Sequence, residues 1–231
     1  MDYNPILVAL DVQTAEEAVR MAERVSPAVG GFKVGLELLM GSGPATVGAL
    51  ISFDKFIFAD AKLHDIPNTV RESARQLGRM GARWVTVHAT GGAEQLEAGV
   101  EGFAAGAGDR DAGVLAVTVL TSLSDADLAQ VGVTGSTGRQ TSRLAKLAES
   151  SGVEGLICSA KELGVTAEVA PSLLRVTPGI RPAGVSADDQ KRVATPQEAI
   201  QRGADYLVIG RAITRAADPR AVAEAILDSI V

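Results

Sequence analysis

The sequence predicts an α/β fold, a (β/α)8 TIM barrel in which residues 1–231 form a single domain. The length of 231 residues fits one barrel, since such barrels commonly run to roughly 200–250 residues as one unit. Short apolar runs alternate with helical patterns to the end of the chain, which is typical of a parallel sheet. There are eight such runs, as a closed barrel requires, and no linker or low-complexity segment interrupts them.

The eight runs are short, mostly apolar and rich in β-branched residues, as expected for strands buried on both faces. They cover residues 6–12, 31–35, 55–61, 84–89, 114–121, 155–159, 173–178 and 206–210. Aromatic residues make up only 3% of the chain, so the core must consist mainly of Val, Ile, Leu and Ala.

The stretches between the runs have helical spacing, and several are introduced by Ser, Thr or Asp caps. The clearest helices are expected at residues 14–25, 69–80, 141–150 and 216–230. An open doubly wound sheet is the alternative fold. A dinucleotide-binding sheet of that kind would normally carry a G-x-G-x-x-G loop after its first strand, whereas this chain continues Asp11-Val-Gln-Thr14.

Composition excludes several classes of partner. A net charge of −6 gives no overall attraction for nucleic acid or acidic membrane surfaces, so a phosphate-bearing ligand would need local positive groups. The N-terminal residues lack a signal-peptide pattern, and no apolar run approaches the ~18 residues of a membrane span. The single cysteine, Cys158, lies in an apolar run and is expected to be a buried free thiol. These features predict a soluble cytoplasmic protein with no nucleic-acid or membrane partner.

Charged residues end the first three predicted strands. In a barrel the chemistry lies at the carboxyl ends of the strands, where Asp11, Lys33, Asp60, Lys62 and Asp65 should meet at one mouth. Asp60 and Lys62 are two residues apart on a strand, so both side chains are expected on one face. Neighbouring carboxylates favour the ammonium form of a lysine, which suits a proton donor rather than a Schiff-base nucleophile. The alternative is an ion-pair network that only closes the barrel layer.

A second group of residues points to a phosphate site. Gly210 and Arg211 follow the last strand directly before a helix, where barrels commonly bind phosphate. Arg211 offers a bidentate fork, and Arg181 can also face the mouth from the seventh strand end. The irregular segment 179–194, which carries Gln190, is either a mobile lid or an ordinary surface loop.

The two histidines, His64 and His88, are expected to have structural or solvent-facing roles rather than a direct part in catalysis. No cysteine or further histidine stands at ligand spacing, so no metal site is expected.

The string Asp60-Ala-Lys62-Leu-His-Asp65-Ile-Pro-Asn-Thr69 resembles that of the bacterial-type orotidine 5'-monophosphate decarboxylases. The resemblance covers nearly the whole chain. It includes Leu10-Asp11, Lys33-Val-Gly35, Val119-Leu-Thr-Ser122, Thr177-Pro-Gly-Ile-Arg181 and Ile209-Gly-Arg211.

The resemblance implies an enzyme that converts orotidine 5'-monophosphate (OMP) to uridine 5'-monophosphate (UMP) and CO2 without a metal or organic cofactor. Lys62 would be the proton donor, Asp60 would face the substrate's carboxylate, and Lys33 would hold Asp60 and the ribose. Asp65 and Thr69 would serve the active site of the neighbouring subunit, which implies a homodimer with sites at the interface.

The same resemblance assigns binding roles around the rest of the substrate. Asp11 would bind a ribose hydroxyl and Thr121 the pyrimidine edge. Gln190, Gly210 and Arg211 would bind the phosphate, with Arg181 nearby on the closing loop.

Two rival functions remain. Mg²⁺-dependent 3-keto-L-gulonate-6-phosphate decarboxylases and hexulose-phosphate synthases resemble the same superfamily and share a D-x-K-x-x-D string. They carry a carboxylate ligand where this chain has Lys33, whose ammonium would repel a divalent cation. A non-catalytic phosphate-binding barrel would keep Gly210 and Arg211 but would not need Asp60 and Lys62.

Overall fold

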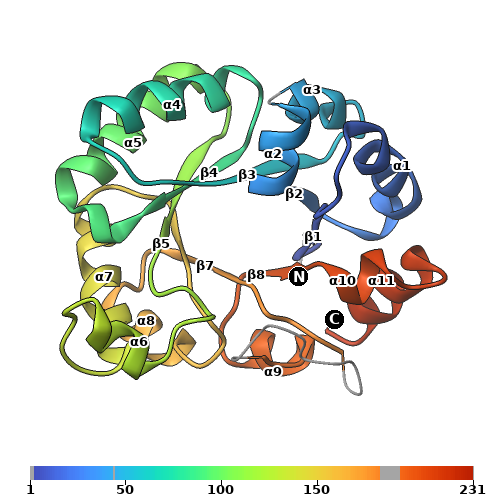
Figure 1. The fold of residues 1–231 in the computed structure, drawn as a ribbon. Helices are drawn as coiled ribbons and strands as arrows, with labels where there is room; N and C mark the ends of the chain where they lie inside the picture. Colours follow the sequence, from blue (N-terminus) through green and yellow to red (C-terminus); the bar gives the residue numbers. More distant parts are fainter. Residues whose placement is uncertain (1–2, 44, 183–192, 231) are drawn as a thin grey trace.

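Eight parallel strands close into a barrel in the computed structural model, which describes residues 3–43, 45–182 and 193–230. Each strand pairs with the next along the chain, and the last pairs with the first (Figure 1). The strands are β1 (Ile6–Ala9), β2 (Gly31–Gly35), β3 (Phe56–Leu63), β4 (Trp84–His88), β5 (Gly113–Val117), β6 (Gly155–Ile157), β7 (Leu174–Thr177) and β8 (Tyr206–Ile209). The predicted (β/α)8 fold is confirmed.

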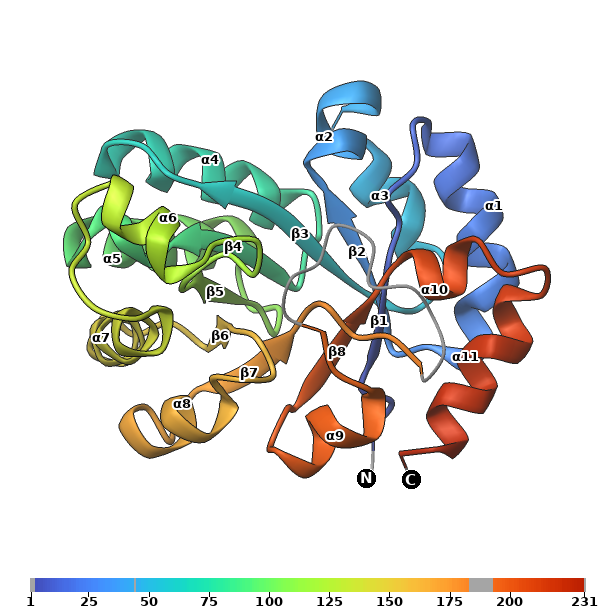
Figure 2. The same ribbon diagram turned by 60° about the horizontal axis from the view of Figure 1, so that its bottom comes forward.

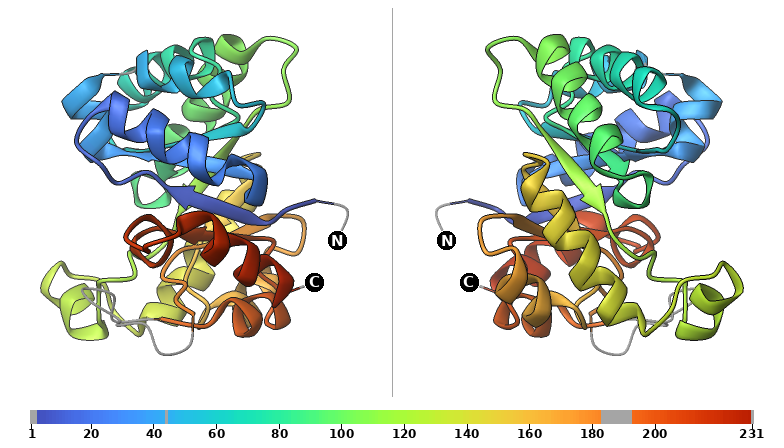
Figure 3. Two further views of the ribbon diagram at one scale, coloured as in Figure 1. Left: turned by 90° about the vertical axis from the view of Figure 1, so that its right-hand side faces the viewer. Right: turned by 90° about the vertical axis from the view of Figure 1, so that its left-hand side faces the viewer.

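Helices surround the barrel, as the two further views of Figure 3 show. They are α1 (Ala15–Val25), α2 (Leu36–Ser42), α3 (Ala45–Ile51), α4 (Pro67–Arg79), α5 (Ala93–Ala107), α6 (Asp125–Gln130), α7 (Thr137–Ser150), α8 (Leu163–Val169), α9 (Pro196–Gln201), α10 (Arg211–Thr214) and α11 (Pro219–Asp228), with short 3-10 turns at Ser26–Ala28 and Ala89–Gly91.

The helix boundaries depart from the sequence prediction where a cap or a proline decides them. The helix expected at 14–25 is α1, with Thr14 as its N-cap in a capping box. The helix expected at 69–80 begins earlier because Pro67 fits the first turn, and the one expected at 141–150 begins earlier because Ser136 caps it. The helix expected at 216–230 is α11, which begins later because Asp218 caps it and Pro219 fits its first turn, and which ends at Asp228.

The first and fifth predicted strands run furthest past the observed ones, while the others differ by at most two residues at an end. The first ends at Ala9 and the fifth at Val117, although the apolar residues continue beyond both points. Val119 is 6% exposed and lines the mouth of the barrel as part of a loop. Apolar character therefore marked burial beyond β5, not continued strand pairing.

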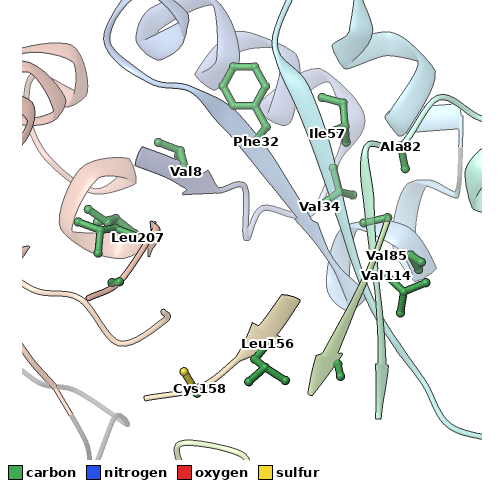
Figure 4. Packing of buried hydrophobic residues seen from close by; sticks show 14 of the residues in the cluster. Val8, Phe32, Val34, Ile57, Ala82, Val85, Val114, Leu156, Cys158 and Leu207 are labelled. Atoms are coloured by element: carbon green, nitrogen blue, oxygen red, sulfur yellow. The ribbon is translucent and has the colours of Figure 1, made fainter. Parts of the chain in front are cut away.

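The core has two parts because successive strand residues point to opposite faces of the sheet. The larger part lies between the strands and the helices and includes Val8, Phe32, Ile57 and Leu156 (Figure 4). Cys158 belongs to it and is a buried free thiol, as predicted, and burial raises its pKa to about 12.

The smaller part of the core fills the barrel itself. It consists of Leu7, Ala9, Phe58, Trp84, Leu115, Val176 and Val208, with Phe56 and Tyr206 packed against it. At the end where the strands begin, the ring of Trp84 lies 5.0 Å from that of Phe56 and 4.8 Å from that of Tyr206, measured between centroids. Aromatic rings therefore close this end, and the opposite end is left for a site.

The C-terminal part of the chain packs against the N-terminal strand. Figure 2 shows α10, which directly follows β8, beside the end of β1. In the part of the chain that the structure describes, no helix has the length and apolar character needed to cross a membrane.

Candidate active site

A cavity of about 630 Å³ opens at the carboxyl ends of the strands. This volume lies in the usual range for pockets that hold a small-molecule ligand. Asp11, Lys33, Asp60 and Lys62 line one side of it, from β1 to β3. The sequence predicted that these residues would meet at one mouth, and the structure brings them together.

The four side chains form a row of alternating charge. Lys33 Nζ lies 3.0 Å from Asp11 Oδ1 and 3.6 Å from Asp60 Oδ2. Lys62 Nζ lies 2.7 Å from the same Oδ2 atom of Asp60. Lys33 is 9% exposed and Asp60 8%, so the centre of the row is largely removed from water, where charge interactions are strongest.

Asp60 is held in its ionised form. Burial acts to raise the pKa of this carboxyl, but the charges of Lys33 and Lys62 and the hydrogen bonds from Lys62 and Thr86 outweigh it. The net result is a pKa below the ordinary aspartate value. At neutral pH this side of the cavity therefore presents a fixed carboxylate beside a lysine.

From the sequence, Asp60 and Lys62 were expected to lie on a regular strand with alternating side chains. The strand is irregular at Lys62. The register between β3 and β4 shifts between Ala59 and Leu63, and Lys62 has a φ of +47°. This is the left-handed region that residues with a Cβ atom rarely adopt. Bulges of this kind re-aim side chains near functional sites, and here the Lys62 ammonium reaches Asp60.

Thr86 was missed by the sequence reasoning. Its hydroxyl donates to Asp60 Oδ1 across 3.0 Å and accepts the backbone N–H of Lys62 across 2.9 Å. A signal was present, because Thr86 is a polar residue two positions from Trp84 and therefore on the same, inward face of a mostly apolar strand.

The remaining wall of the cavity carries residues that were predicted to bind the rest of a ligand. Arg181, Gly210 and Arg211, expected near a phosphate, line it, as does Thr121, expected at the pyrimidine edge, and Arg181 is 8% exposed. A Cβ atom at Gly210 would lie 3.5 Å from Ala9 Cβ and 3.5 Å from Asp11 Oδ2, which is ordinary contact. The protein itself therefore does not demand glycine there; the missing side chain leaves room in the cavity. Three polar or charged lining residues were not singled out from the sequence, namely Glu37, Thr214 and Arg215.

Asp65, which was expected to meet the charged row at the same mouth, lies apart from it, as does Thr69. Among the described residues that line the cavity, neither is present, and both are exposed at the turn from β3 into α4. The Asp65 N–H donates to Gln95 Oε1 across 3.2 Å, and Asp65 Oδ1 accepts the N–H of Ile66. These two hydrogen bonds fix the backbone of the turn at Asp65 and Ile66, while Thr69 remains exposed to solvent. Gln190, with residues 183–192 of the suggested lid, lies outside the described residues.

The two histidines lie next to the charged row, with ring centroids 5.3 Å apart. His64 is exposed and His88 is partly buried. Burial, His64 and Lys62 lower the pKa of His88. Among residues 3–43, 45–182 and 193–230, no three His, Cys, Asp or Glu side chains are grouped so that they could hold a metal ion.

A closed parallel barrel with a charged cavity at the carboxyl ends of its strands defines the class of (β/α)8-barrel enzymes. The sequence model of the orotidine 5'-phosphate decarboxylase / HUMPS family matches residues 4–226. The chain belongs to this family.

Individual relatives are similar over nearly the full length. The chain is 50% identical over 222 residues to the orotidine 5'-phosphate decarboxylase of Anaeromyxobacter sp. (strain K), with 96% of each chain covered. It is 45% identical to that of Dichelobacter nodosus (strain VCS1703A), with 100% of both chains covered. Among solved structures, orotidine 5'-phosphate decarboxylase from Lactobacillus acidophilus superposes with a TM-score of 0.87 at 38% identity, covering 98% of this chain and 99% of that one.

Proposed function

We propose that this protein is an orotidine 5'-phosphate decarboxylase, a carboxy-lyase that converts OMP to UMP and CO2 in pyrimidine biosynthesis. The observation that carries the proposal is the charged row in which Lys62 Nζ lies 2.7 Å from Oδ2 of the buried Asp60 inside the cavity. Relatives that are 45–50% identical over nearly the whole chain bear this name. We assign the reaction to one catalytic domain formed by residues 1–231 and place it in the cytoplasm.

The reaction needs positive charge beside one ring carbon. Loss of CO2 from C6 of the pyrimidine leaves a carbanion that no adjacent carbonyl can delocalise, so a preorganised cation must stabilise it. In this proposal Lys62 is that cation, and its Nζ then delivers the proton that quenches the carbanion. The direct route needs no metal or organic cofactor, since Lys62 supplies both the charge and the proton.

Asp60 and Lys33 complete the reacting side of the cavity. Asp60 is ionised and faces the substrate's own carboxylate, so like-charge repulsion is relieved as CO2 leaves. Lys33 contacts both Asp11 and Asp60, which lets it hold the carboxylate of Asp60 and meet the ribose. Asp11, at 50% side-chain exposure, is open to bind a ribose hydroxyl.

Substrate binding is assigned to further residues around the mouth of the barrel. Arg211 and the Gly210 backbone bind the phosphate together with Gln190, Arg181 lies nearby, and Thr121 meets the pyrimidine edge. The phosphate contacts are remote from C6, so their binding energy serves to align the substrate rather than to act on the reacting bond.

A homodimer accounts for the exposed turn after β3. Asp65 and Thr69 are exposed, and Ile66 between them is 68% exposed. Other exposed apolar residues also follow the carboxyl ends of strands β2 and β5, namely Leu36, Met40, Leu120 and Val131. A second copy of the chain would cover such residues. In the dimer, Asp65 and Thr69 of each subunit would reach the cavity of the other subunit.

The test is the ultraviolet absorbance of OMP mixed with the purified protein in excess EDTA, with UMP identified by chromatography. We expect rapid conversion, because no divalent cation takes part in the proposed reaction. No conversion in EDTA, with turnover of a sugar phosphate restored by Mg²⁺, would contradict the proposal.

The Mg²⁺-dependent rivals are disfavoured by the position of Lys33. Its ammonium lies 3.0 Å from one carboxylate of the row and 3.6 Å from the other, between the oxygens that a divalent cation would use. A non-catalytic barrel is disfavoured because a phosphate sensor has no need for a buried lysine and aspartate pair beside its ligand.

A further inference from the structure

Thr86 is a fully buried residue of β4 whose hydroxyl meets two parts of the charged row. Its Oγ1 atom donates to Asp60 Oδ1 and accepts the backbone N–H of Lys62. A hydroxyl has one proton to donate and lone pairs with which to accept. Because a backbone N–H can only donate, the hydroxyl proton is left for the carboxylate.

The first bond fixes the plane of the Asp60 carboxylate. Both lysines contact its Oδ2 atom, Lys62 at 2.7 Å and Lys33 at 3.6 Å. Two contacts on one oxygen leave the group able to rotate about its last side-chain bond. The Thr86 hydroxyl binds the other oxygen and so determines this rotation.

The second bond holds the irregular backbone of β3. Lys62 has a φ of +47° at the shift in register, and strained backbone of this kind persists only where its surroundings hold it. The Lys62 N–H is bound by a side chain of the neighbouring strand instead of a carbonyl. The direction of the Lys62 side chain therefore depends on that hydroxyl.

We propose that Thr86 is a positioning residue, whose single hydroxyl sets the carboxylate of Asp60 and the backbone of Lys62 relative to one another. The inference rests on the proposed function, because Asp60 and Lys62 are the reacting-side groups of that reaction. Thr86 itself is not among the residues that line the described cavity, so it acts through its two partners.

The kinetic test compares Thr86→Val, which keeps the shape and removes the hydroxyl, with Thr86→Ser, which keeps the hydroxyl. In Thr86→Val we expect kcat for OMP to fall about 10- to 100-fold, because misplacing a reacting group by about 1 Å can cost ~10²-fold in rate. KM and the Kd for UMP should change far less, since the phosphate contacts are untouched. Thr86→Ser should stay near the wild-type kcat.

A matched control separates this role from loss of stability. Thr166 is equally buried, and its hydroxyl donates to the carbonyl of Leu163 across 3.0 Å, outside the charged row. Thr166→Val should lower Tm without the fall in kcat. If Thr86→Val does not fold, Thr86→Ala replaces it in every measurement.

A readout without substrate keeps the inference separate from the reaction. The Asp60 carboxyl can be titrated by ¹³C NMR and assigned with Asp60→Asn. Its pKa should be higher in Thr86→Val than in the wild type, because a hydrogen bond to the charged form is lost, and unchanged in Thr86→Ser. An unaltered titration together with wild-type kcat in Thr86→Val would overturn the inference, as would a Thr86→Ser variant as impaired as Thr86→Val. Failure of the wild-type protein to convert OMP would refute the proposed function alone, and the titration would still decide the role of Thr86.

Discussion

The two ends of the barrel interior are occupied by different kinds of side chain, aromatic at one end and charged at the other. Where the strands begin, Trp84, Phe56 and Tyr206 fill the space with aromatic rings. Arg83 lies over the Trp84 ring at 5.1 Å and donates to Glu154. Where the strands end, Lys33 and the carboxylates beside it occupy equivalent inward positions around a cavity.

The difference indicates that the aromatic end stabilises the fold and that the charged end lowers its stability. Burying aromatic surface is favourable in proportion to its area. Burying lysines and aspartates brings a desolvation penalty that their attraction only partly offsets, and the φ of +47° at Lys62 adds strain. The closed end should therefore govern stability, and the open end should govern activity.

The largest effect should follow from Lys62→Ala at the open end. We expect kcat for OMP to fall by about 10⁴-fold or more, because the variant loses the residue proposed as both the cation beside C6 and the proton donor. Binding of UMP should persist, since Gly210 and Arg211 are unchanged. Absorbance assays and calorimetric titration with UMP measure the two properties, and near-normal turnover would refute the mechanism.

Substitution at the closed end should give the opposite pattern. Trp84 is 1% exposed, and Trp84→Ala should lower the free energy of unfolding by about 3–5 kcal/mol through the cavity it leaves. The folded fraction should keep a kcat within about tenfold of wild type. Chemical denaturation and assays on the same samples decide this.

Trp84→Phe sharpens that comparison. The indole N–H is buried without a hydrogen-bond partner in the part of the chain that the structure describes. Its removal relieves a desolvation penalty, which offsets part of the packing energy that the smaller ring loses. The Phe variant should therefore be destabilised much less than the Ala variant. Equal destabilisation by the two would mean that ring packing does not hold this end together.

The comparison also explains what could be predicted from the sequence. The barrel was predictable because eight apolar runs with helices between them leave few other arrangements. The last helix was predicted to start three residues too early, at 216 instead of 219, because apolar spacing does not show that Asp218 caps it and Pro219 begins it. Charged residues at strand ends were visible because they interrupt apolar strands.

The geometry within the site was not predictable in the same way. Alternation along the strand placed Asp60 and Lys62 on one face, but the contact depends on a bulge that no spacing rule encodes. Thr86 comes from the next strand, and its bonds to both residues appear only when the strands are paired. The exposed positions of Asp65 and Thr69 could not be foreseen from spacing either, because their assigned role involves a second chain.

A smaller effect should appear in the acid stability of the open end. The pKa of Asp60 is lowered below its reference value of 3.8, so the folded state binds this proton less readily than the unfolded state. The stability contributed by the charged form is fully present above that value and is lost as the pH falls through the folded-state pKa. The unfolding free energy of the wild type minus that of Asp60→Asn should be constant from about pH 7 to 5 and should fall below about pH 4.

Asp109→Asn, in the exposed loop between α5 and β5, is the control for the general effect of removing one carboxylate. The unfolding free energy of the wild type minus that of Asp109→Asn should not show the fall below about pH 4 that is expected for Asp60→Asn. A wild-type advantage over Asp60→Asn that grew on acidification would show that the charged carboxylate does not stabilise the folded row.

The smallest expected effect concerns His88, and it too belongs to the open end, where both histidines of the chain lie. Burial, followed by His64 and Lys62, lowers the pKa of His88 below 6.5, so the folded state binds this proton less readily than the unfolded state. Stability should therefore decline as the pH falls from the unfolded-state value of 6.5 toward the lower folded-state pKa. His88→Gln should remove this part of the slope while keeping the backbone carbonyl that accepts from Gln95, and His64→Gln is the exposed counterpart. Histidine NMR titration gives the direct measurement: a His88 that titrates above its ordinary range would mean that the carboxylate of Asp60, not burial, dominates its surroundings.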